Sequence, residues 1–378
     1  MSIVIVDDNR TNLVIIEKIL RKAGYDNLVL LSSAKELYHF LGMDSNAAGE
    51  VPVDLILMDL MMPEIDGVEA CRTVLKQERL RDLPIIFVTA MGDSYKMAEA
   101  LDAGALDYVM KPINKVELLA RIRSTLRLKH EKDLRKERDK RIQNELTLAK
   151  QVQRSMLSSP IHDQAVDISA VYEPSSELAG DLYAWYQIAP NRYAVILLDM
   201  MGHGISSSLV CMYMYAGLKD TIMGGSDPKA VMDELNRRMN QLQMSDRLIN
   251  YYFTAIYLVL DTEKRTIQYV NAGHPAGVAM VDGKAVMLDK GCCALGFFER
   301  IDIVQDEISY ARQARLILFT DGLVESLGVE HENGMVPIVS RLQEQAEHDP
   351  VSFVQKLQPG AGRDDLKDDR CLVMISTK

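Results

Sequence analysis

The chain has 378 residues, which is too long for one ordinary domain and predicts two domains joined by a linker. Hydrophobic residues make up 48% and charged residues 26%, a composition typical of soluble globular proteins and unlike that of a disordered chain. The formal net charge of −11 argues against nucleic acid as a direct partner.

Two further features of the sequence bear on the cellular location of the protein. No apolar run approaches the roughly 20 residues that a membrane-spanning helix needs. The N-terminal stretch MSIVIVDDNR reaches acidic residues too early for a secretory signal peptide, so we expect a cytoplasmic protein with no membrane association. The 5 cysteines show no CxxC spacing, so the sequence supports neither a zinc site nor a disulfide framework.

Residues 1–126 alternate short apolar runs with helical patterns. The expected elements are strands at 3–6, 54–59, 84–90 and 107–112, and helices at 12–23, 66–79 and 94–103. Such alternation predicts a doubly wound α/β fold, a parallel sheet with helices on both faces. In this fold the functional crevice lies at the carboxyl ends of the strands.

Five polar side chains end or follow these strands: Asp7, Asp8, Asp59, Thr89 and Lys111. Three neighbouring carboxylates repel one another unless a divalent cation such as Mg²⁺ lies among them. A lysine and a threonine hydroxyl suit a phosphoryl group, and a carboxylate beside Mg²⁺ can attack phosphorus to form an acyl phosphate. Each residue alone also has a structural explanation, such as a helix N-cap for Asp59. The inference therefore rests on the five together.

The stretches VDDN, DLILMDLMMPEIDG, VTA and DYVMKP resemble the signature motifs of two-component receiver domains, over residues 1–124. The resemblance implies a flavodoxin-like fold and phosphorylation of Asp59 by a cognate histidine kinase. The implied Mg²⁺ ligands are Asp7, Asp8, Asp59 and the backbone carbonyl of Met61. Thr89 and Lys111 would bind the phosphoryl group, and Thr89 and Tyr108 would change position on activation. Packing alone would also explain an aromatic residue at position 108.

Residues 125–158 predict a helical linker, because no glycine or proline occurs before Pro160. Ile142, Ala149 and Met156 are spaced by seven, which favours a short coiled coil and a homodimer. A single helix whose later part packs on the second domain is the alternative. The linker is basic, but its charges alternate in sign as on a solvated helix, which argues against DNA binding.

Residues 159–378 predict a domain of a different kind, rich in β-strands. The expected elements are strands at 192–199, 250–261, 266–274, 314–322 and 370–377, and helices at 205–223, 227–242 and 348–357. Consecutive helices between strand-rich stretches predict an α+β fold, with two sheets sandwiched by helices.

Acidic residues again stand beside predicted strand ends: Asp181, Asp199, Asp321, Asp368 and Asp369. There is no serine nucleophile elbow, and clustered aspartates without histidine or cysteine ligands favour Mg²⁺ or Mn²⁺ over zinc. Two such ions can activate a water molecule and hold a phosphoryl group in line with it.

The stretches LAKQVQRSML, AGDLY, LLDMMGHG, VNAGHP, LFTDGLVES and DDRCLVMI resemble metal-dependent PPM serine/threonine phosphatases, in the bacterial branch typified by the sporulation phosphatase SpoIIE. The resemblance covers residues 145–378 and implies two Mn²⁺ or Mg²⁺ ions. The implied ligands are Asp181, Asp199, Asp321, Asp368 and the carbonyl of Met200. Asp199 would bridge the two metals rather than act as a nucleophile. Asp369 could take the place of Asp368.

The sequence also departs from the family pattern, at Ala179, Ala184, Met200 and Cys371. These substitutions remove no predicted metal ligand, so we expect activity. His203 is a candidate general acid, although a turn histidine beside glycines is more often structural, and we interpret His274 as structural.

Together the halves predict a response regulator whose output domain is a phosphatase. The resemblance implies that the substrate is a phosphoserine or phosphothreonine protein, with a STAS-domain anti-sigma-factor antagonist as the best candidate. The linker would carry the signal from Asp59 to the catalytic domain. The alternative is a receiver that controls a non-catalytic docking module built on a degenerate phosphatase domain. A DNA-binding regulator is not supported, because no helix-turn-helix pattern follows the receiver.

Overall fold

The computed structural model describes residues 1–43, 53–90, 94–245, 251–327, 335–343, 349–357 and 367–378. The chain forms two compact units, Met1–Ile142 and Gln143–Lys378. Within the described residues, no helix combines the length and the apolar character that are needed to cross a membrane.

The first unit contains a five-stranded sheet with the strand order β2-β1-β3-β4-β5. Its strands are β1 (Ser2–Val6), β2 (Asn27–Leu31), β3 (Leu55–Asp59), β4 (Ile85–Ala90) and β5 (Asp107–Lys111). Its helices are α1 (Arg10–Lys22), α2 (Ala34–Phe40), α3 (Gly67–Lys76), the 3-10 helix η1 (Glu78–Leu80), α4 (Ser94–Asp102) and the first part of α5 (Lys115–Met156). All neighbouring strands are parallel, which confirms the doubly wound α/β fold.

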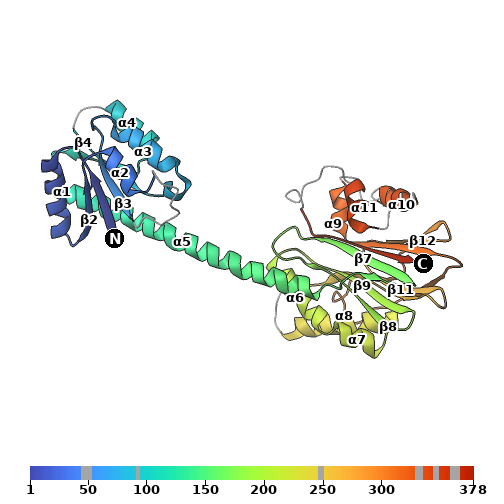
Figure 1. Ribbon diagram of the computed structural model, residues 1–378. Helices are drawn as coiled ribbons and strands as arrows, with labels where there is room; N and C mark the ends of the chain where they lie inside the picture. Colours follow the sequence, from blue (N-terminus) through green and yellow to red (C-terminus); the bar gives the residue numbers. More distant parts are fainter. Residues whose placement is uncertain (44–52, 91–93, 246–250, 328–334, 344–348, 358–366) are drawn as a thin grey trace. The chain divides into compact units, whose positions relative to one another are not determined.

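Helices cover both faces of this sheet (Figure 1). α1 and α5 bury apolar side chains such as Leu13 and Ile122 against one face. α2, α3 and α4 pack on the other face, with Leu37 and Val74 in the core. The central strands are buried on both sides, which explains why they are continuous apolar runs in the sequence.

The sequence-based prediction missed β2 and α2. β2 lies at the edge of the sheet and is only partly buried, so its apolar pattern is weak. α2 has only 7 residues, too few for helical periodicity to be recognised. The helix expected at 66–79 is α3 followed by η1.

α5 is one helix of 42 residues, and it confirms that residues 125–156 of the expected linker are helical. Its first turns belong to the core of the first unit, where Leu118, Ile122 and Leu126 are buried. The chain therefore passes from the first unit to the second without leaving the helix. The division into 1–124, 125–158 and 159–378 stays a prediction.

The second unit contains two six-stranded sheets, ordered β14-β11-β10-β9-β8, with β15 beside β11, and β13-β12-β16-β17-β7-β6. The first sheet comprises β8 (Asp181–Ala189), β9 (Arg192–Met200), β10 (Phe253–Asp261), β11 (Thr266–Ala272), β14 (Gly291–Cys292) and β15 (Asp306–Ser309). The second comprises β6 (Ile161–His162), β7 (Val166–Glu173), β12 (Gly277–Val281), β13 (Lys284–Leu288), β16 (Ala314–Phe319) and β17 (Arg370–Thr377). The helices are α6 (Ile205–Ala216), α7 (Leu218–Gly224), α8 (Pro228–Ser245), α9 (Asp321–Ser326), α10 (Met335–Gln343) and α11 (Pro350–Leu357).

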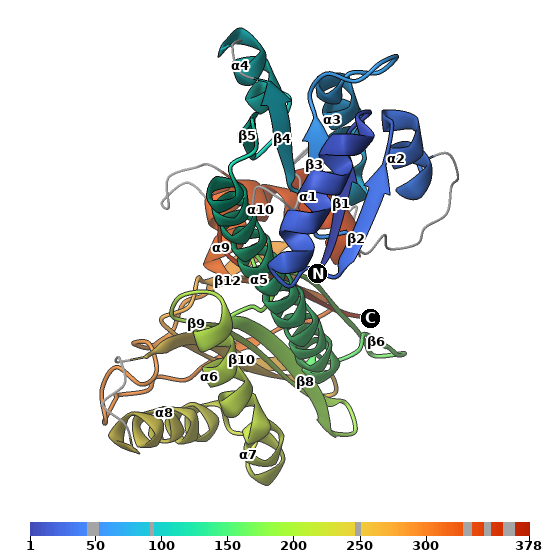
Figure 2. The ribbon, with the colours of Figure 1, turned by 90° about the vertical axis from the view of Figure 1, so that its left-hand side faces the viewer.

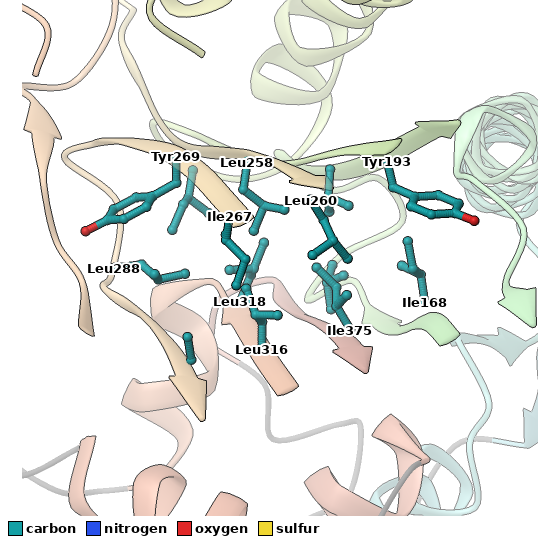
Figure 3. Packing of buried hydrophobic residues seen from close by; sticks show 14 of the residues in the cluster. Ile168, Tyr193, Leu258, Leu260, Ile267, Tyr269, Leu288, Leu316, Leu318 and Ile375 are labelled. Atoms are coloured by element: carbon teal, nitrogen blue, oxygen red, sulfur yellow. The ribbon is translucent and has the colours of Figure 1, made fainter. Parts of the chain in front are cut away.

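The two sheets pack face to face around an apolar core. Figure 3 shows Leu258 and Leu260 of one sheet pointing toward Leu316, Leu318 and Ile375 of the other. A second core lies between the first sheet and α6–α8 (Figure 2), and a third lies between the second sheet and α9–α11. This arrangement confirms the expected sandwich of two sheets between helices.

Two expected elements of this unit need correction. The helix expected at 205–223 is two helices, α6 and α7, which meet at Gly217. A Cβ atom at Gly217 would lie 1.3 Å from Nη1 of Arg238, so a larger residue would require the Arg238 side chain of α8 to move. The strand expected at 314–322 ends at Phe319, and Asp321 begins α9.

Other differences concern element boundaries and elements that the prediction missed. The strand expected at 250–261 begins at Phe253, and the one expected at 266–274 ends at Ala272. Residues 250 and 348 lie outside the described residues. The prediction also did not locate the strands β7, β8, β12, β13 and β15, the two-residue strands β6 and β14, or the helices α9 and α10.

Candidate active site

The first group of candidate residues lies at the carboxyl edge of the parallel sheet. Asp7 directly follows β1, and Asp59 ends β3. One carboxylate oxygen from each of Asp7, Asp8 and Asp59 lies within 4.8 Å of the other two. In the described part of the chain, no other set of three acidic, histidine or cysteine side chains is so closely spaced. The chemistry of this donor set fits a hard divalent cation.

Lys111 contributes the positive charge of this cluster. Its Nζ lies 3.0 Å from Oδ2 of Asp7 and 2.9 Å from Oδ2 of Asp59. Burial raises the pKa of Asp59 above its ordinary value and Asp7 adds to this effect, while the ammonium group of Lys111 opposes it. The backbone N–H of Met61 also donates to the Asp59 carboxylate. The ammonium group of Lys111 and the backbone N–H of Met61 are donors of the kind that bind a phosphoryl oxygen.

Thr89 and Tyr108 lie on the two strands beyond Asp59. Thr89 is buried near the end of β4, and Tyr108 is half-buried on β5. The guanidinium carbon of Arg121, on α5, lies 5.6 Å from the centre of the Tyr108 ring. Arg121 also donates to both carboxylate oxygens of Asp107, at 2.6 and 2.7 Å. A change in the position of Tyr108 would therefore alter its contact with Arg121 on α5.

The second group of candidate residues comes from both sheets of the second unit. Asp181 begins β8 and pairs directly with Asp199 on β9. Asp321 is the first residue of α9, just after β16, while Asp368 and Asp369 immediately precede β17. The fold thus brings together acids that are up to 188 positions apart in the sequence, between Asp181 and Asp369.

Burial and mutual repulsion dominate the electrostatics of this acidic cluster. Asp181 is 3% exposed, and its Oδ2 has no hydrogen-bond partner within the described residues. Burial raises the pKa of Asp181 well above its ordinary value, and Asp199 adds to this. Burial also raises the pKa of Asp199 to about 8, with Asp321 and Asp368 contributing. Buried carboxylates that repel one another, with an oxygen left unpaired, fit a divalent cation site.

The structure distinguishes the two neighbouring aspartates, Asp368 and Asp369. Asp369 is buried, and its carboxylate accepts hydrogen bonds from the N–H and hydroxyl of Ser175, at 2.8 and 2.9 Å, and from the N–H of Gly180, at 2.7 Å. Asp368 is only partly buried, and its Oδ1 accepts a hydrogen bond from the N–H of Asp369 at 2.8 Å. The carboxylate of Asp369 is therefore occupied by the chain's own donors, whereas Asp368 keeps lone pairs for a cation.

Gly180 allows close backbone approach beside Asp181. A Cβ atom at this position would lie 2.9 Å from the carbonyl oxygen of Gly202 and 3.1 Å from that of Met200. The N–H of Met200 approaches the Gly180 carbonyl at 3.4 Å. Any larger side chain would push apart the two segments that carry Asp181 and Asp199.

The end of α5 contacts the same segment. Gln153 is 1% exposed, and its Nε2 donates to the carbonyl of Ala179 at 2.7 Å while its Oε1 accepts from the Ala179 N–H at 3.1 Å. The Ser158 hydroxyl accepts from the N–H of Trp185, on β8, at 2.9 Å. The last turns of α5 and the residue Ser158 just after the helix thus hydrogen-bond to the chain on both sides of Asp181.

Sequence reasoning missed the roles of Gln153 and Thr320. Thr320 is fully buried, and its side chain hydrogen-bonds to the Asp181 carboxylate. A glutamine within the apolar seam of a helix, and a threonine ending a buried strand, are both polar residues at core positions. Such residues need hydrogen-bond partners, and that is the signal which could have found them.

The two histidines considered in the sequence lie in different environments. His203 is exposed between Gly202 and Gly204. His274 is buried, with Nδ1 2.8 Å from the hydroxyl oxygen of Thr254, and burial lowers its pKa to about 3. His274 is therefore neutral at physiological pH and held by its neighbours, in keeping with the structural interpretation.

Ala184 stands where an acid is common in the phosphatase family. It is fully buried in the core between the first sheet and α6–α8. An acidic side chain at this position would have to be accommodated among apolar groups. The departure at Ala184 is therefore compatible with the packing of this chain.

The architecture and the two acidic clusters define a protein with a receiver domain and a β-sandwich phosphatase domain. The family model "Stage II sporulation protein E (SpoIIE)" matches residues 189–378, and the model "Response regulator receiver domain" matches residues 3–123. The chain belongs to the SpoIIE family and carries a receiver domain in front of the family domain. Asp199, Asp321 and Asp368 lie inside the SpoIIE match, whereas Asp181 precedes it.

Known proteins are similar to each half of the chain. Phosphoserine phosphatase RsbP of Bacillus subtilis (strain 168) is 41% identical over 182 residues, 48% of this chain and 45% of that protein. Response regulator ArlR of Staphylococcus aureus (strain Mu50 / ATCC 700699) is 48% identical over 81 residues, 21% of this chain and 36% of that protein. The chain thus spans less than half the length of these relatives.

A solved structure shows the fold of the second unit. The SiaA-PP2C domain of Pseudomonas aeruginosa superposes with a TM-score of 0.53 at 22% identity, covering 62% of this chain and 97% of that one. The phosphatase-type sandwich is therefore shown by comparison as well as by topology.

Proposed function

We propose that the protein is a response regulator in which phosphorylation of Asp59 activates a metal-dependent protein serine/threonine phosphatase. The observation that carries the catalytic part is the acidic cluster, whose buried Asp181 oxygen lacks a partner and whose Asp199 has its pKa raised to about 8. A cluster of this kind costs folding free energy unless a cation neutralises it. The similarity to a phosphoserine phosphatase over 182 residues of the chain supports the same reaction class.

In this proposal Asp181, Asp199, Asp321 and Asp368 hold two Mn²⁺ or Mg²⁺ ions, with the Met200 carbonyl assisting. When bound, these ions supply Lewis acidity and lower the pKa of a coordinated water. Asp199 is influenced electrostatically by Asp321 and Asp368, and it would bridge the two ions. The Thr320 side chain lies beside the Asp181 carboxylate and opposes the rise in its pKa, while Asp369 holds the loop that ends at Gly180.

The receiver cluster supports the regulatory half of the proposal. Asp7, Asp8, Asp59 and the Met61 carbonyl would bind Mg²⁺, and a histidine kinase would supply the phosphoryl group. Lys111 lies within hydrogen-bond distance of Asp59, where it can neutralise a phosphoryl oxygen. Thr89 and Tyr108 would respond to the new charge, and Arg121 connects Tyr108 with α5.

In this proposal α5 connects the receiver domain with the phosphatase domain. Its exposed apolar residues include Ile142, Leu148 and Val152, at 41%, 63% and 42% exposure, which leaves surface for a second copy of the chain. We propose a homodimer through this helix. The substrate would be a phosphoserine or phosphothreonine protein, with a STAS-domain anti-sigma-factor antagonist as the first candidate.

Asp368 and Asp369 are expected to respond differently to the same substitution. Asp368→Asn should raise the Mn²⁺ concentration for half-maximal hydrolysis of p-nitrophenyl phosphate by about tenfold or more, with little change in thermal stability. Asp369→Asn turns an amide N–H toward backbone donors and should cost about 1–3 kcal/mol of folding free energy. Metal titrations and thermal unfolding of both variants provide the comparison. The opposite pattern would make Asp369 the ligand.

Gln153→Leu is expected to reduce phosphatase activity and stability together. The substitution leaves the buried N–H and C=O of Ala179 without partners, which should destabilise the second unit by about 2 kcal/mol and loosen the Asp181 segment. Gln151→Leu is the matched control, because Gln151 is exposed on the same helix. Both variants are compared by thermal unfolding and by Mn²⁺-dependent turnover. Equal behaviour of the two would rule out the proposed contact between α5 and the metal site.

A further inference from the structure

An exposed patch of large apolar side chains lies on the second unit. We define the aromatic patch as Met201, Tyr252, Phe297 and Phe298. Phe297 is 60% exposed and Phe298 is 55% exposed, and Met201 is 40% exposed. Isolated exposed apolar residues are ordinary, but a contiguous group of them marks an interaction site.

The members of the aromatic patch contact one another. The ring centres of Tyr252 and Phe297 are 5.4 Å apart, and those of Phe297 and Phe298 are 5.0 Å apart, both edge to face. The N–H of Met201 donates to the carbonyl of Tyr252 at 3.0 Å. Three separate segments, after β9, before β10 and after β14, therefore build one surface.

Buried polar groups hold the loop that carries the two phenylalanines. Asn236 on α8 is 1% exposed, and its Nδ2 donates to the carbonyls of Phe298 and Glu299, at 3.0 and 3.2 Å. Its Oδ1 accepts from the N–H of Gly296 at 2.8 Å, and Leu295 exchanges two backbone hydrogen bonds with Phe253. The aromatic rings are thus displayed on a pre-organised loop, so a partner would not have to order this loop on binding.

The backbone that carries the aromatic patch lies next to the backbone that carries Asp199. Met201 is two residues from Asp199, and Phe253, next to Tyr252, pairs with Met200 across β9 and β10. A phosphorylated side chain that reaches Asp199 must bring the protein surface around it close to these residues. The aromatic patch is therefore placed to contact whatever protein is dephosphorylated.

We propose that the aromatic patch docks the phosphoprotein substrate through an apolar surface beside its phosphorylated serine or threonine. This inference rests on the proposed phosphatase function. The metal ions that the acidic cluster would hold can recognise only the phosphoryl group, which all such substrates share. Rigid aromatic side chains supply contact area at low entropic cost, so the aromatic patch selects which phosphoprotein is dephosphorylated.

The test uses the full chain with Mn²⁺ and two substrates, p-nitrophenyl phosphate and a STAS-domain antagonist phosphorylated on serine. Phe297→Ala, Phe298→Ala and the double variant are compared with Phe40→Ala, a control at a 37% exposed phenylalanine of the receiver domain. The double variant should lose about 10- to 100-fold in kcat/KM for the phosphoprotein, mainly through KM. The loss for the aryl phosphate should be at least tenfold smaller, and Phe40→Ala should change neither.

Three results would overturn docking at the aromatic patch. They are an equal loss on both substrates, no loss on the phosphoprotein, and a shift from dimer to monomer in sedimentation with equal effects on both substrates. The last result would make the aromatic patch a contact between copies of this chain. If the wild type hydrolyses neither substrate, the proposed function fails. Calorimetric titration with the phosphoprotein then still decides whether the double variant binds it more weakly.

Discussion

Asp199→Asn is expected to lower Mn²⁺-dependent hydrolysis of p-nitrophenyl phosphate by about 10²- to 10³-fold or more. Asparagine keeps the shape of the side chain but removes the carboxylate that we propose as a metal ligand together with Asp181, Asp321 and Asp368. The measurement is initial rate against Mn²⁺ concentration, from micromolar to millimolar. Wild-type turnover that vanishes in this variant would support the assignment of Asp199 as the bridging ligand.

Thermal unfolding without metal controls for misfolding of this variant. Burial and the neighbouring acids disfavour the charged form of Asp199 in the metal-free protein, so a neutral asparagine at this position carries no electrostatic penalty. Asp199→Asn should therefore be at least as stable as the wild type in the presence of a chelator. Retained turnover in the variant would place the metals elsewhere. A wild type without turnover under any metal condition would favour the alternative of a non-catalytic docking module.

Asp59→Asn is expected to abolish activation of the phosphatase by beryllofluoride, which mimics an aspartyl phosphate. In the wild type we expect stimulation of about 5- to 150-fold, the usual range of coupling between two sites. Lys111 contacts Asp59 at 2.9 Å, and the substitution removes the carboxylate that we propose as the phosphoryl acceptor. The measurement is the turnover rate of the full chain with Mg²⁺, with and without beryllofluoride.

Asp66→Asn is the matched control for this experiment. Asp66 lies in the loop between β3 and α3, where its side chain caps α3 through the N–H of Glu69 at 2.8 Å. Asparagine caps helices about as well as aspartate, so this variant should respond to beryllofluoride like the wild type. Inhibition of the wild type by beryllofluoride would reverse the proposed sign of regulation. Stimulation that persists in Asp59→Asn would exclude this residue as the acceptor.

The sequence by itself determined the fold class of both halves and the types of residue at both acidic clusters. The buried parallel strands of the first unit are continuous apolar runs, and Asp7 and Asp59 stand where two of these runs end. The end of the run therefore marks the candidate site residue in the sequence. The helical linker was equally clear, since a long stretch without glycine or proline has few alternatives. Short and edge elements, such as α2 and β2, were missed because they bury too little to impose a pattern.

Only the tertiary structure decided the roles of residues whose partners are distant in sequence. Asp368 and Asp369 are chemically identical neighbours. Their difference arises because the backbone N–H groups of Ser175 and Gly180 converge on one of them. The buried hydrogen bonds of Gln153 to Ala179 likewise need a helix and a strand to meet, across 26 positions of the chain. Local patterns record which face of an element is buried, but they do not record which polar groups meet there, because hydrogen bonds and charge repulsion act between neighbours in space.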